Sequence, residues 1–431
     1  MKKNFFIFNF IPSWLIILLP FFLITGPFLS DLVVSLVAIL FLINSLKNKI
    51  KKYFDNYYFK FFCLFWVILI ISSSLSNNVI ISLKSSFFYF RFGFFSLCFW
   101  YLLDNNKNLI KYLFTSLLVC FSSLIIDGYI QYLFGKNLLG FELYNEYRVS
   151  SFFGSELILG SYLARFFPVL FALFIYLDEV KKNKLTLFFI TIVFILSEGL
   201  IFLSGERLAL FFMNLSAIFI ILMIKNYRLY RLLTYLISLL LIIVMINVFP
   251  NAKQRLIDQT INDFTRGTFQ NNDSNDNKLY IFSKPHNDMY ISAYRIFLDN
   301  KFFGVGPRQF RNECENYSVS SYSCETHPHN TYMELLSEAG VFAFLIVAFL
   351  FLSIFFISLK HFVYKIFNLH KGTMNDFQVC LISSVLISLW PFSPSGSFFN
   401  NWMSIVYYFP VGILLWEVFK YKNPNKNTKK S

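Results

Sequence analysis

The stretch VFAFLIVAFLFLSIFFISL, residues 341–359, decides the fold because it runs for nineteen residues without a charged side chain. A helix over this stretch is about 28 Å long at 1.5 Å per residue, which matches the hydrocarbon core of a bilayer. We predict an all-α polytopic membrane protein with about 12 transmembrane helices. The other apolar runs lie at residues 9–26, 30–46, 58–75, 86–103, 112–134, 156–177, 185–203, 208–224, 232–249, 377–394 and 401–418.

The composition also argues against a soluble protein. Of 431 residues, 56% are hydrophobic and only 14% are charged, which is more apolar surface than a soluble chain of this length can bury. Twelve spans of about 20 residues would use about 240 residues. The chain begins Met1-Lys2-Lys3 and enters an apolar run that lacks a small-residue cleavage site, so we expect an uncleaved first helix.

Positive charge follows every even-numbered span, while the odd-numbered connections carry few Lys or Arg. This is the positive-inside pattern, and it predicts that both termini are cytoplasmic. The net charge of +14 is therefore a signal of topology, and we expect no nucleic-acid partner. The basic residues concerned are Lys47, Lys49, Lys51, Lys52, Lys107, Lys111, Lys181, Lys182, Lys184, Lys225, Arg228, Arg231, Lys360, Lys365, Lys371, Lys420, Lys422, Lys426, Lys429 and Lys430.

A long external connection divides the chain before the tenth span. The loop carries nine Lys or Arg and nine Asp or Glu between residues 253 and 325. We expect its Asn-rich part, 262–278, to be flexible, followed by a helix over 289–297 and a turn at 304–307. The predicted regions are N-terminal transmembrane helices (1–139), central transmembrane helices (140–249), a periplasmic loop (250–331), and C-terminal transmembrane helices with a cytoplasmic tail (332–431).

Two cysteines, Cys314 and Cys324, share this loop. In an oxidising compartment we expect a disulfide between them, with two free thiols as the alternative.

The motif THPHNTYMELLSEAG, residues 326–340, places polar side chains directly before the tenth span. His329 is suited to take a proton from a hydroxyl near neutral pH, and His327 is its neighbour. The plainer interpretation is that Asn330 and Thr331 begin the helix, because Thr331-x-x-Glu334 fits a capping box.

Two arginines are predicted to share the external face with this motif. Arg207 in LSGERLAL lies at the mouth of the eighth span, and Arg295 in SAYRIFLDNKFFGVGP lies in the loop. Alone, Arg207 would be an interface anchor and Arg295 a solvated surface residue. Together with His329 they suit a lipid diphosphate, because forked guanidinium donors match phosphate oxygens. A straight tenth helix would hold His329 above Arg207, so the loop or a tilt must bring them together.

These motifs resemble those of the bacterial O-antigen ligase and polymerase family of membrane glycosyltransferases. The resemblance rests on HPHNTYMELLSEAG, on YRIF followed by GVGPRQF, on SGERLAL and on WPFSPSGSFFNNWMSIVYYFPVGILLW, and it covers residues 140–431 best. It implies that His329 is the base or acceptor-orienting group, that Arg207 and Arg295 are functional, and that no metal or cofactor is used. Supporting positions within the matched motifs are His327, Asn330, Gly304 and Gly306.

Charged residues inside the predicted spans are expected to be paired or functional, because an unpaired charge is costly in hydrocarbon. Arg165, Asp127 and Glu198 fall in the sixth, fifth and seventh predicted spans. We expect a buried ion cluster that supports the site, and the alternative is that Arg165 binds substrate directly. His286-Asn287 is a second His-Asn pair, which ranks below His329 because no apolar span follows it.

The predicted reaction is an inverting, metal-independent transfer of an oligosaccharide (O-antigen) in lipopolysaccharide biosynthesis. The donor would be undecaprenyl diphosphate and the preferred acceptor a hydroxyl of lipid A–core, on the periplasmic face of the bacterial inner membrane. The sequence leaves open a polymerase of the same family or transfer to a protein serine. From another class, a lipid-linked glycan transporter or flippase would use the charges within the spans as its pathway.

Overall fold

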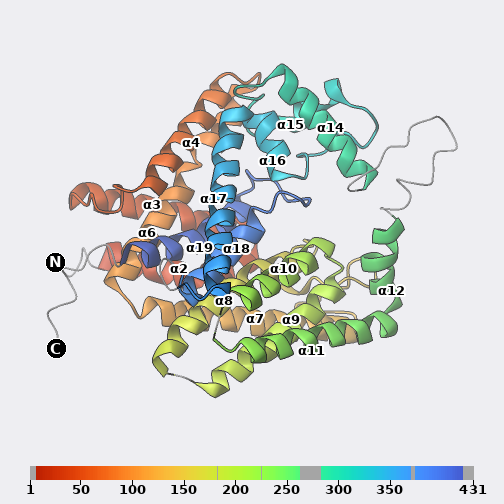
Figure 1. Ribbon diagram of the computed structural model, residues 1–431. Helices are drawn as coiled ribbons and strands as arrows, with labels where there is room; N and C mark the ends of the chain where they lie inside the picture. Colours follow the sequence, from red (N-terminus) through yellow and green to blue (C-terminus); the bar gives the residue numbers. More distant parts are fainter. Residues whose placement is uncertain (1–5, 182, 225, 263–282, 370–373, 421–431) are drawn as a thin grey trace.

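The computed structural model describes residues 6–181, 183–224, 226–262, 283–369 and 374–420. These residues form a helical bundle with a smaller helical lobe on one side (Figure 1). The predicted flexible segment, 262–278, lies outside the described residues except for Asn262.

Within the described residues, each predicted span coincides with a helix. Ten helical segments are long and apolar enough to cross a membrane, while α10 and α18 are shorter apolar helices. The prediction of an all-α polytopic membrane protein is therefore confirmed. The helices at these positions are α2 (Ile11–Thr25), α3 (Pro27–Lys47), α4 (Tyr57–Ser74), α6 (Phe90–Asn105), α7 (Leu109–Phe134), α8 (Leu159–Lys181), α9 (Lys184–Ser204), α10 (Arg207–Met223), α11 (Arg228–Val248), α17 (Gly340–Ile366), α18 (Asp376–Ser388) and α19 (Asn401–Phe419).

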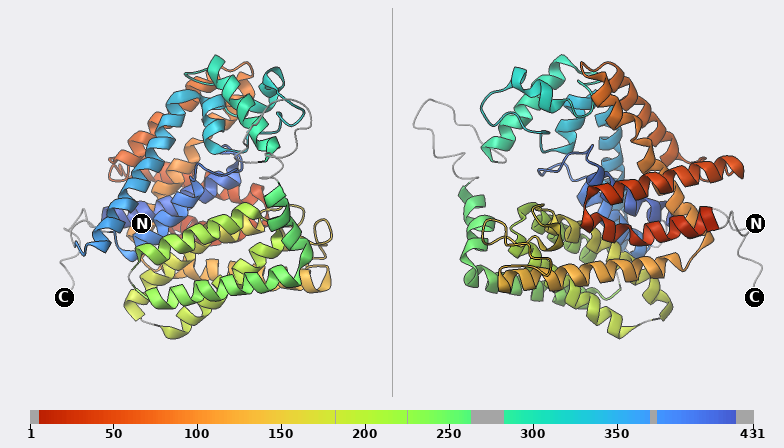
Figure 2. Two further views of the ribbon diagram at one scale, coloured as in Figure 1. Left: turned by 45° about the vertical axis from the view of Figure 1, so that its right-hand side comes forward. Right: turned by 180° about the vertical axis from the view of Figure 1, so that it is seen from behind.

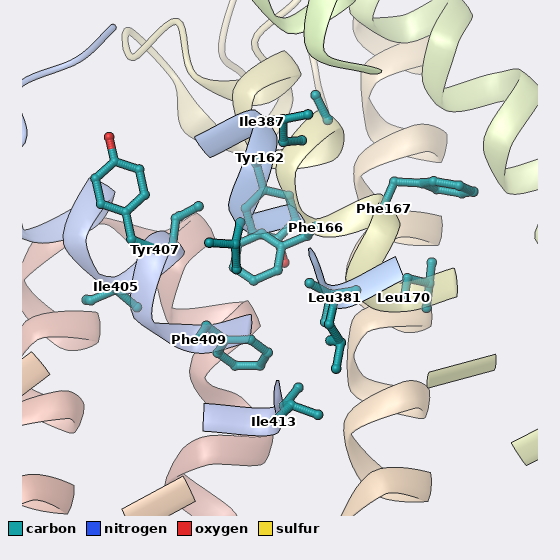
Figure 3. Packing of buried hydrophobic residues seen from close by; sticks show 14 of the residues in the cluster. Tyr162, Phe166, Phe167, Leu170, Leu381, Ile387, Ile405, Tyr407, Phe409 and Ile413 are labelled. Atoms are coloured by element: carbon teal, nitrogen blue, oxygen red, sulfur yellow. The ribbon is translucent and has the colours of Figure 1, made fainter. Parts of the chain in front are cut away.

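The centre of the bundle is α8, against which α7, α9, α10 and α18 pack. Figure 3 shows Tyr162 and Phe166 of α8 beside Phe409 of α19 and the aliphatic side chains of α18. The rings of Phe166 and Phe409 meet edge to face with centroids 5.4 Å apart. Because packing is a main force between helices in a bilayer, these contacts position Arg165 on α8 relative to α19.

The helical lobe lies beside one end of α17 in both views of Figure 2. It comprises α14 (Lys284–Asp299), α15 (Phe310–Glu313), η4 (Cys314–Tyr317) and α16 (Thr331–Glu334), so the helix predicted over 289–297 is present and longer. A disulfide joins Cys314 to Cys324 and closes the lobe. Its small core consists of Ala293, Ile296, Val305, Phe310 and Cys314.

The path from the lobe into α17 is not a straight helix. A π-helical turn, η5 (Leu335–Ala339), follows α16, and Gly340, the first residue of α17, has a left-handed φ of 76°. This break turns the chain, and Figure 2 shows α17 running obliquely through the molecule. The straight tenth helix that would hold the histidine motif above the other groups is therefore absent from this part of the chain.

The turn at 304–307 docks onto the π-helical turn. The backbone N–H groups of Val305 and Gly306 donate to the carbonyls of Ser337 and Glu338 at 3.0 and 2.8 Å. Gly304 has a φ of 64°, and a Cβ there would collide with the backbone at Glu338. Only glycine permits this approach, so GVGP attaches the lobe to the start of α17.

Smaller elements complete the chain. They are η1 (Phe6–Phe10), α5 (Val79–Phe87), η2 (Ser151–Phe153), α12 (Pro250–Lys253) and η3 (Gln254–Asp258). Of these, α12 and η3 follow α11 on the side of the molecule that carries the lobe (Figure 1).

Candidate active site

Three histidines from two segments meet in the lobe. The ring centroids of His327 and His329 are 4.0 Å apart, and the ring of His286 on α14 lies 5.7 Å from that of His329. The pairing of His286 with His329 differs from the low rank that the sequence alone gives His286, although the tripeptide Pro-His-Asn occurs at both 285–287 and 328–330 and is a signal for the pair. Among the described residues, no group of three His, Cys, Asp or Glu side chains is arranged to hold a metal ion.

Burial favours the neutral form of both histidines of the motif. Burial lowers the pKa of His327 to about 4, and the neighbouring His329 contributes to the decrease. Burial also lowers the pKa of His329 below its ordinary value, while Glu325 opposes the shift. A neutral imidazole has one lone pair that can accept a proton. In His327 this lone pair is on Nδ1 and faces the Thr326 hydroxyl at 3.0 Å, because Nε2 donates to the Ser395 carbonyl at 3.4 Å.

Asn330 attaches the histidine motif to the connection between α18 and α19. Its Nδ2 donates to the carbonyls of Pro391 and Ser393 at 3.0 and 3.2 Å. The backbone of Ser395 then pairs with the motif, because its N–H donates to the carbonyl of His329 at 2.8 Å. Residues 391–399, hereafter the 391–399 segment, therefore position the histidine motif.

The capping box predicted for Thr331 and Glu334 is wrong. Asn330 is the N-cap of α16, and its Oδ1 accepts from the N–H groups of Tyr332 and Met333 at 3.0 and 3.1 Å. Glu334 points instead to the 391–399 segment, where it accepts from Ser397 Oγ at 2.6 Å and Phe398 N at 2.7 Å. Because Asn330 is the N-cap, Thr331 is the first helical residue and a capping box would need a Glu or Gln at position 333. Glu334 lies one residue beyond that position.

A second carboxylate holds the GVGPRQF turn. Glu338 is buried and accepts from the backbone N–H groups of Arg308 and Phe310 at 2.6 and 2.8 Å. The guanidinium of Arg308 donates to the carbonyl of Phe399 at 3.0 Å. Arg308 thus connects the turn to the 391–399 segment, a contact that sequence analysis did not anticipate.

Arg207 lies in a separate cluster at the start of α10. Its Nε donates to the carbonyl of Arg255 at 3.0 Å, and its Nη2 donates to Oε1 of Gln259 at 3.1 Å. The same Gln259 oxygen accepts from Nη1 of Arg255 at 2.9 Å. Gln259 therefore holds two guanidinium groups side by side.

A third guanidinium, that of Arg148, completes the cluster. Its Nε donates to the carbonyl of Ser204 at 2.8 Å. Burial lowers the pKa of Arg148, and the like charge of Arg255 adds to the decrease, while Glu206 opposes it. The Glu206 carboxylate is itself engaged at the N-terminus of α8 by the N–H groups of Gly160 and Ser161, at 2.6 and 2.9 Å. Arg148, Arg207 and Arg255, hereafter the arginine cluster, thus gather positive charge.

Arg165 lies between the two clusters. Only 2% of it is exposed, and its guanidinium carbon is 4.9 Å from the ring centre of Phe212. Its electrostatic neighbours are Tyr407 and Glu206, and Tyr407 in turn faces Thr331 next to Asn330. A line of polar side chains therefore leads from the histidine motif through Arg165 to the arginine cluster.

The buried ion cluster predicted for Arg165, Asp127 and Glu198 does not form. Asp127 accepts instead from Leu138 N at 2.9 Å, Ser151 Oγ at 2.6 Å and the Asn137 amide at 3.2 Å. These donors all belong to the connection between α7 and α8, because a buried carboxylate is satisfied by the nearest N–H and O–H groups. Glu198 lies beside Ser238 of α11.

Arg295 and His286 occupy opposite sides of α14. Nine residues separate them, which is two and a half helical turns, and Arg295 is exposed. The structure thus gathers His327, His329 and Asn330, places Arg207 in the arginine cluster, and leaves Arg295 on the outer surface of the lobe.

The fold and these clusters define a polytopic membrane protein with a polar, cation-rich site on one side of its helical bundle. Residues 187–348 match the O-antigen ligase family, and the resemblance to the O-antigen ligase and polymerase family is confirmed over this region. The matched region includes Arg207, His286, Arg295 and His329. A search of curated proteins found no match. The family match supports glycosyl transfer of the O-antigen ligase and polymerase type, with a lipid-linked glycan and an acceptor as partners.

Proposed function

We propose that the protein transfers an oligosaccharide from undecaprenyl diphosphate to an acceptor hydroxyl, with lipid A–core as the preferred acceptor. The reaction would take place on the periplasmic face of the bacterial inner membrane, with both termini in the cytoplasm. The observation that carries the proposal is the arginine cluster on the same side of the bundle as two neutral histidines. The family match over residues 187–348 supports the reaction class.

The arginine cluster is suited to a diphosphate. Guanidinium groups held close together repel one another, and an anion relieves both this repulsion and the cost of desolvating the charges. Forked N–H donors match phosphate oxygens in pairs. We therefore assign the diphosphate clamp to Arg207 together with Arg148 and Arg255. The role of Arg295 in substrate binding stays a prediction, because its exposed side chain would reach the donor only from the outer face of the lobe.

The proposed chemistry is a single displacement. The acceptor oxygen bonds to the anomeric carbon as the bond from that carbon to the diphosphate oxygen breaks, which inverts the configuration. His329 takes the hydroxyl proton, because its lowered pKa keeps the imidazole neutral. The electron pair of the broken bond leaves with the carrier diphosphate, whose growing charge the guanidinium groups stabilise.

The test is a glycan profile of cells that depend on this protein. With His329→Ala or Arg207→Ala, we expect capped lipopolysaccharide to disappear and lipid-linked glycan to accumulate. Arg228→Ala is the matched control, because Arg228 is exposed at the opposite end of the bundle, at the start of α11, and should leave the profile unchanged. A polymerase would instead leave single-repeat caps. Unchanged glycan in both site variants would defeat the transferase proposal and favour a transporter.

A further inference from the structure

The connection between α7 and α8 contains a tight polar turn beside the arginine cluster. The backbones of Tyr144 and Arg148 pair through two N–H···O hydrogen bonds of 2.9 Å each. Between them, Asn145 and Glu146 have left-handed φ angles of 49° and 68°. Glycine and asparagine are the usual residues at such positions of a hairpin, so Glu146 holds a strained backbone. Strain of this kind often accompanies function, and residues 144–148 are hereafter the 144–148 turn.

A buried glutamine of α7 holds this connection in place. The Gln131 side chain is fully buried. Its amide nitrogen donates to two backbone carbonyls before the turn, at 3.2 and 3.1 Å. Its oxygen accepts from the N–H groups of Ser150 and Ser151 after the turn, at 3.0 and 2.7 Å. Because one side chain bonds both arms of the connection, the 144–148 turn is fixed relative to the bundle.

The turn places tyrosine rings against a member of the arginine cluster. The guanidinium carbon of Arg148 lies 5.9 Å from the ring centre of Tyr144, and Tyr147 is a further electrostatic neighbour of Arg148. Arg255 packs close by, because a Cβ at Gly205 would meet Arg148 Nε at 3.1 Å and Arg255 Cγ at 3.3 Å. Tyr144 nevertheless stays 38% exposed. An accessible aromatic ring therefore borders the arginine cluster.

The same connection has an apolar part, which differs in character from the 144–148 turn. Leu138 and Leu139 are 64% and 66% exposed, and exposed leucines next to the end of a span suit the apolar side of the membrane interface. In the 144–148 turn the exposed neighbours of Tyr144 are instead Asn145 and Glu146. An amide and a carboxylate suit a hydroxyl-rich ligand and disfavour a hydrocarbon chain.

We propose that the 144–148 turn is a sugar subsite of the donor site, in which the Tyr144 ring stacks on the sugar attached to the diphosphate. The inference rests on the proposed function. Because the ring is adjacent to Arg148, a diphosphate on this guanidinium would place its sugar within reach of Tyr144. One face of a sugar ring carries C–H groups that pack on an aromatic ring, and its hydroxyls bond to polar side chains. Tyr144 would thus select donors whose first sugar has an open C–H face.

Binding measurements with purified protein in nanodiscs separate the sugar from its carrier. One probe is lipid-linked glycan extracted from cells that lack this protein, and the other is undecaprenyl diphosphate without a sugar. We expect Tyr144→Ala to weaken binding of the lipid-linked glycan about tenfold. Binding of bare undecaprenyl diphosphate should not change. Tyr144→Phe and Tyr144→Trp should bind both probes like the wild type, because stacking requires only an aromatic ring.

A matched control and the fold of the turn make these measurements interpretable. The hydrogen bonds that close the turn join backbone groups, so Tyr144→Ala should fold. Tyr57→Ala is the control, because Tyr57 is 79% exposed and begins α4. The other end of α4 is the one near the lobe, where Ser72 donates to the carbonyl of Glu338 at 3.0 Å. Tyr57→Ala should therefore bind both probes normally.

The outcomes distinguish this inference from the proposed function. Equal weakening of both probes by Tyr144→Ala would show that the ring serves the carrier or only supports Arg148, and would overturn the inference. An increase confined to KM for the acceptor would also overturn it. If Tyr144→Ala binds and transfers glycan like the wild type, the subsite fails while the proposed function stands. If the binding results are as expected but the wild type transfers no glycan, the proposed function fails while the subsite stands.

Discussion

Asn330 is predicted to control helix stability and site geometry through two separate halves of its side chain. Its Oδ1 caps α16 by accepting two backbone hydrogen bonds, and its Nδ2 donates to the carbonyls of Pro391 and Ser393. Serine can replace the acceptor at an N-cap, but it is too short to reach both carbonyls. Asn330→Ser should therefore keep the cap and release the 391–399 segment, whereas Asn330→Ala removes both functions.

The magnitudes follow from the hydrogen bonds. Loss of an N-cap costs about 0.5–2 kcal/mol, and each of the two donated hydrogen bonds contributes about 1 kcal/mol. We expect Asn330→Ser to lose about 1–2 kcal/mol of stability and Asn330→Ala about 2–4 kcal/mol. Both variants should lose activity to a similar degree, about a hundredfold, because release of the segment shifts His329 by an ångström or so.

The assay combines thermal unfolding of the purified protein with kcat for glycan transfer. Asn400 is a matched control, because it caps α19 in the same way, accepting from the N–H groups of Trp402 and Met403. Asn400→Ala should cost only the cap, about 1 kcal/mol, and leave kcat unchanged. Full activity in Asn330→Ser, or equal stability of the Ser and Ala variants, would show that Oδ1 and Nδ2 of Asn330 do not have the separate roles proposed here.

Three further predictions concern pH, a glycine turn and a buried carboxylate. Burial lowers the pKa of His329 below the ordinary value of about 6.5. We therefore expect kcat/KM for glycan transfer to be constant from about pH 7 upward and to fall tenfold per pH unit only below the His329 pKa. A decline in kcat/KM that begins near pH 8 would contradict this. Gly304→Ala should cost about 1–3 kcal/mol more than Gly140→Ala in thermal unfolding, because both have left-handed φ but only Gly304 faces a backbone at the Cβ position. Asp127→Asn should lower the unfolding temperature, because the amide keeps one acceptor oxygen but turns an NH2 donor toward either Leu138 N or Ser151 Oγ, which Asp127 accepts through different oxygens. The double variant Asp127→Arg with Arg165→Asp should be no more stable or active than either single variant. A recovery of stability or of glycan transfer would instead show that Asp127 and Arg165 form an ion pair.

The helices were predictable because their determinants are local. An apolar run of sufficient length specifies a span, and helical spacing of Met289, Ala293 and Ile296 specifies the buried side of α14. The two glycines and the proline also predicted the turn at 304–307. The position of Asn330 at a helix start also followed from the sequence, although the cap belongs to Asn330 and not to Thr331.

The composition of the site was less predictable because it depends on contacts between distant segments. Arg148 comes from the connection before α8 and Arg255 from the turn after α11, and neither carries a local signal that links it to Arg207. The 391–399 segment was quoted as a family motif, but its bonds to Asn330 and Glu334 span about sixty residues of chain. Asp127 was misassigned because a charge within an apolar run invites an opposite charge as partner, whereas the structure supplies N–H and O–H donors.

The proposed function requires that the arginine cluster and the histidine motif bind one donor molecule. Its most direct test is a structure of the protein in a nanodisc with a non-transferable undecaprenyl-diphosphate-linked sugar. We expect phosphate oxygens at about 2.7–3.2 Å from guanidinium nitrogens of Arg148, Arg207 or Arg255, with the anomeric carbon directed toward His329. A diphosphate bound away from all three guanidinium groups, or a sugar directed away from the histidines, would contradict it.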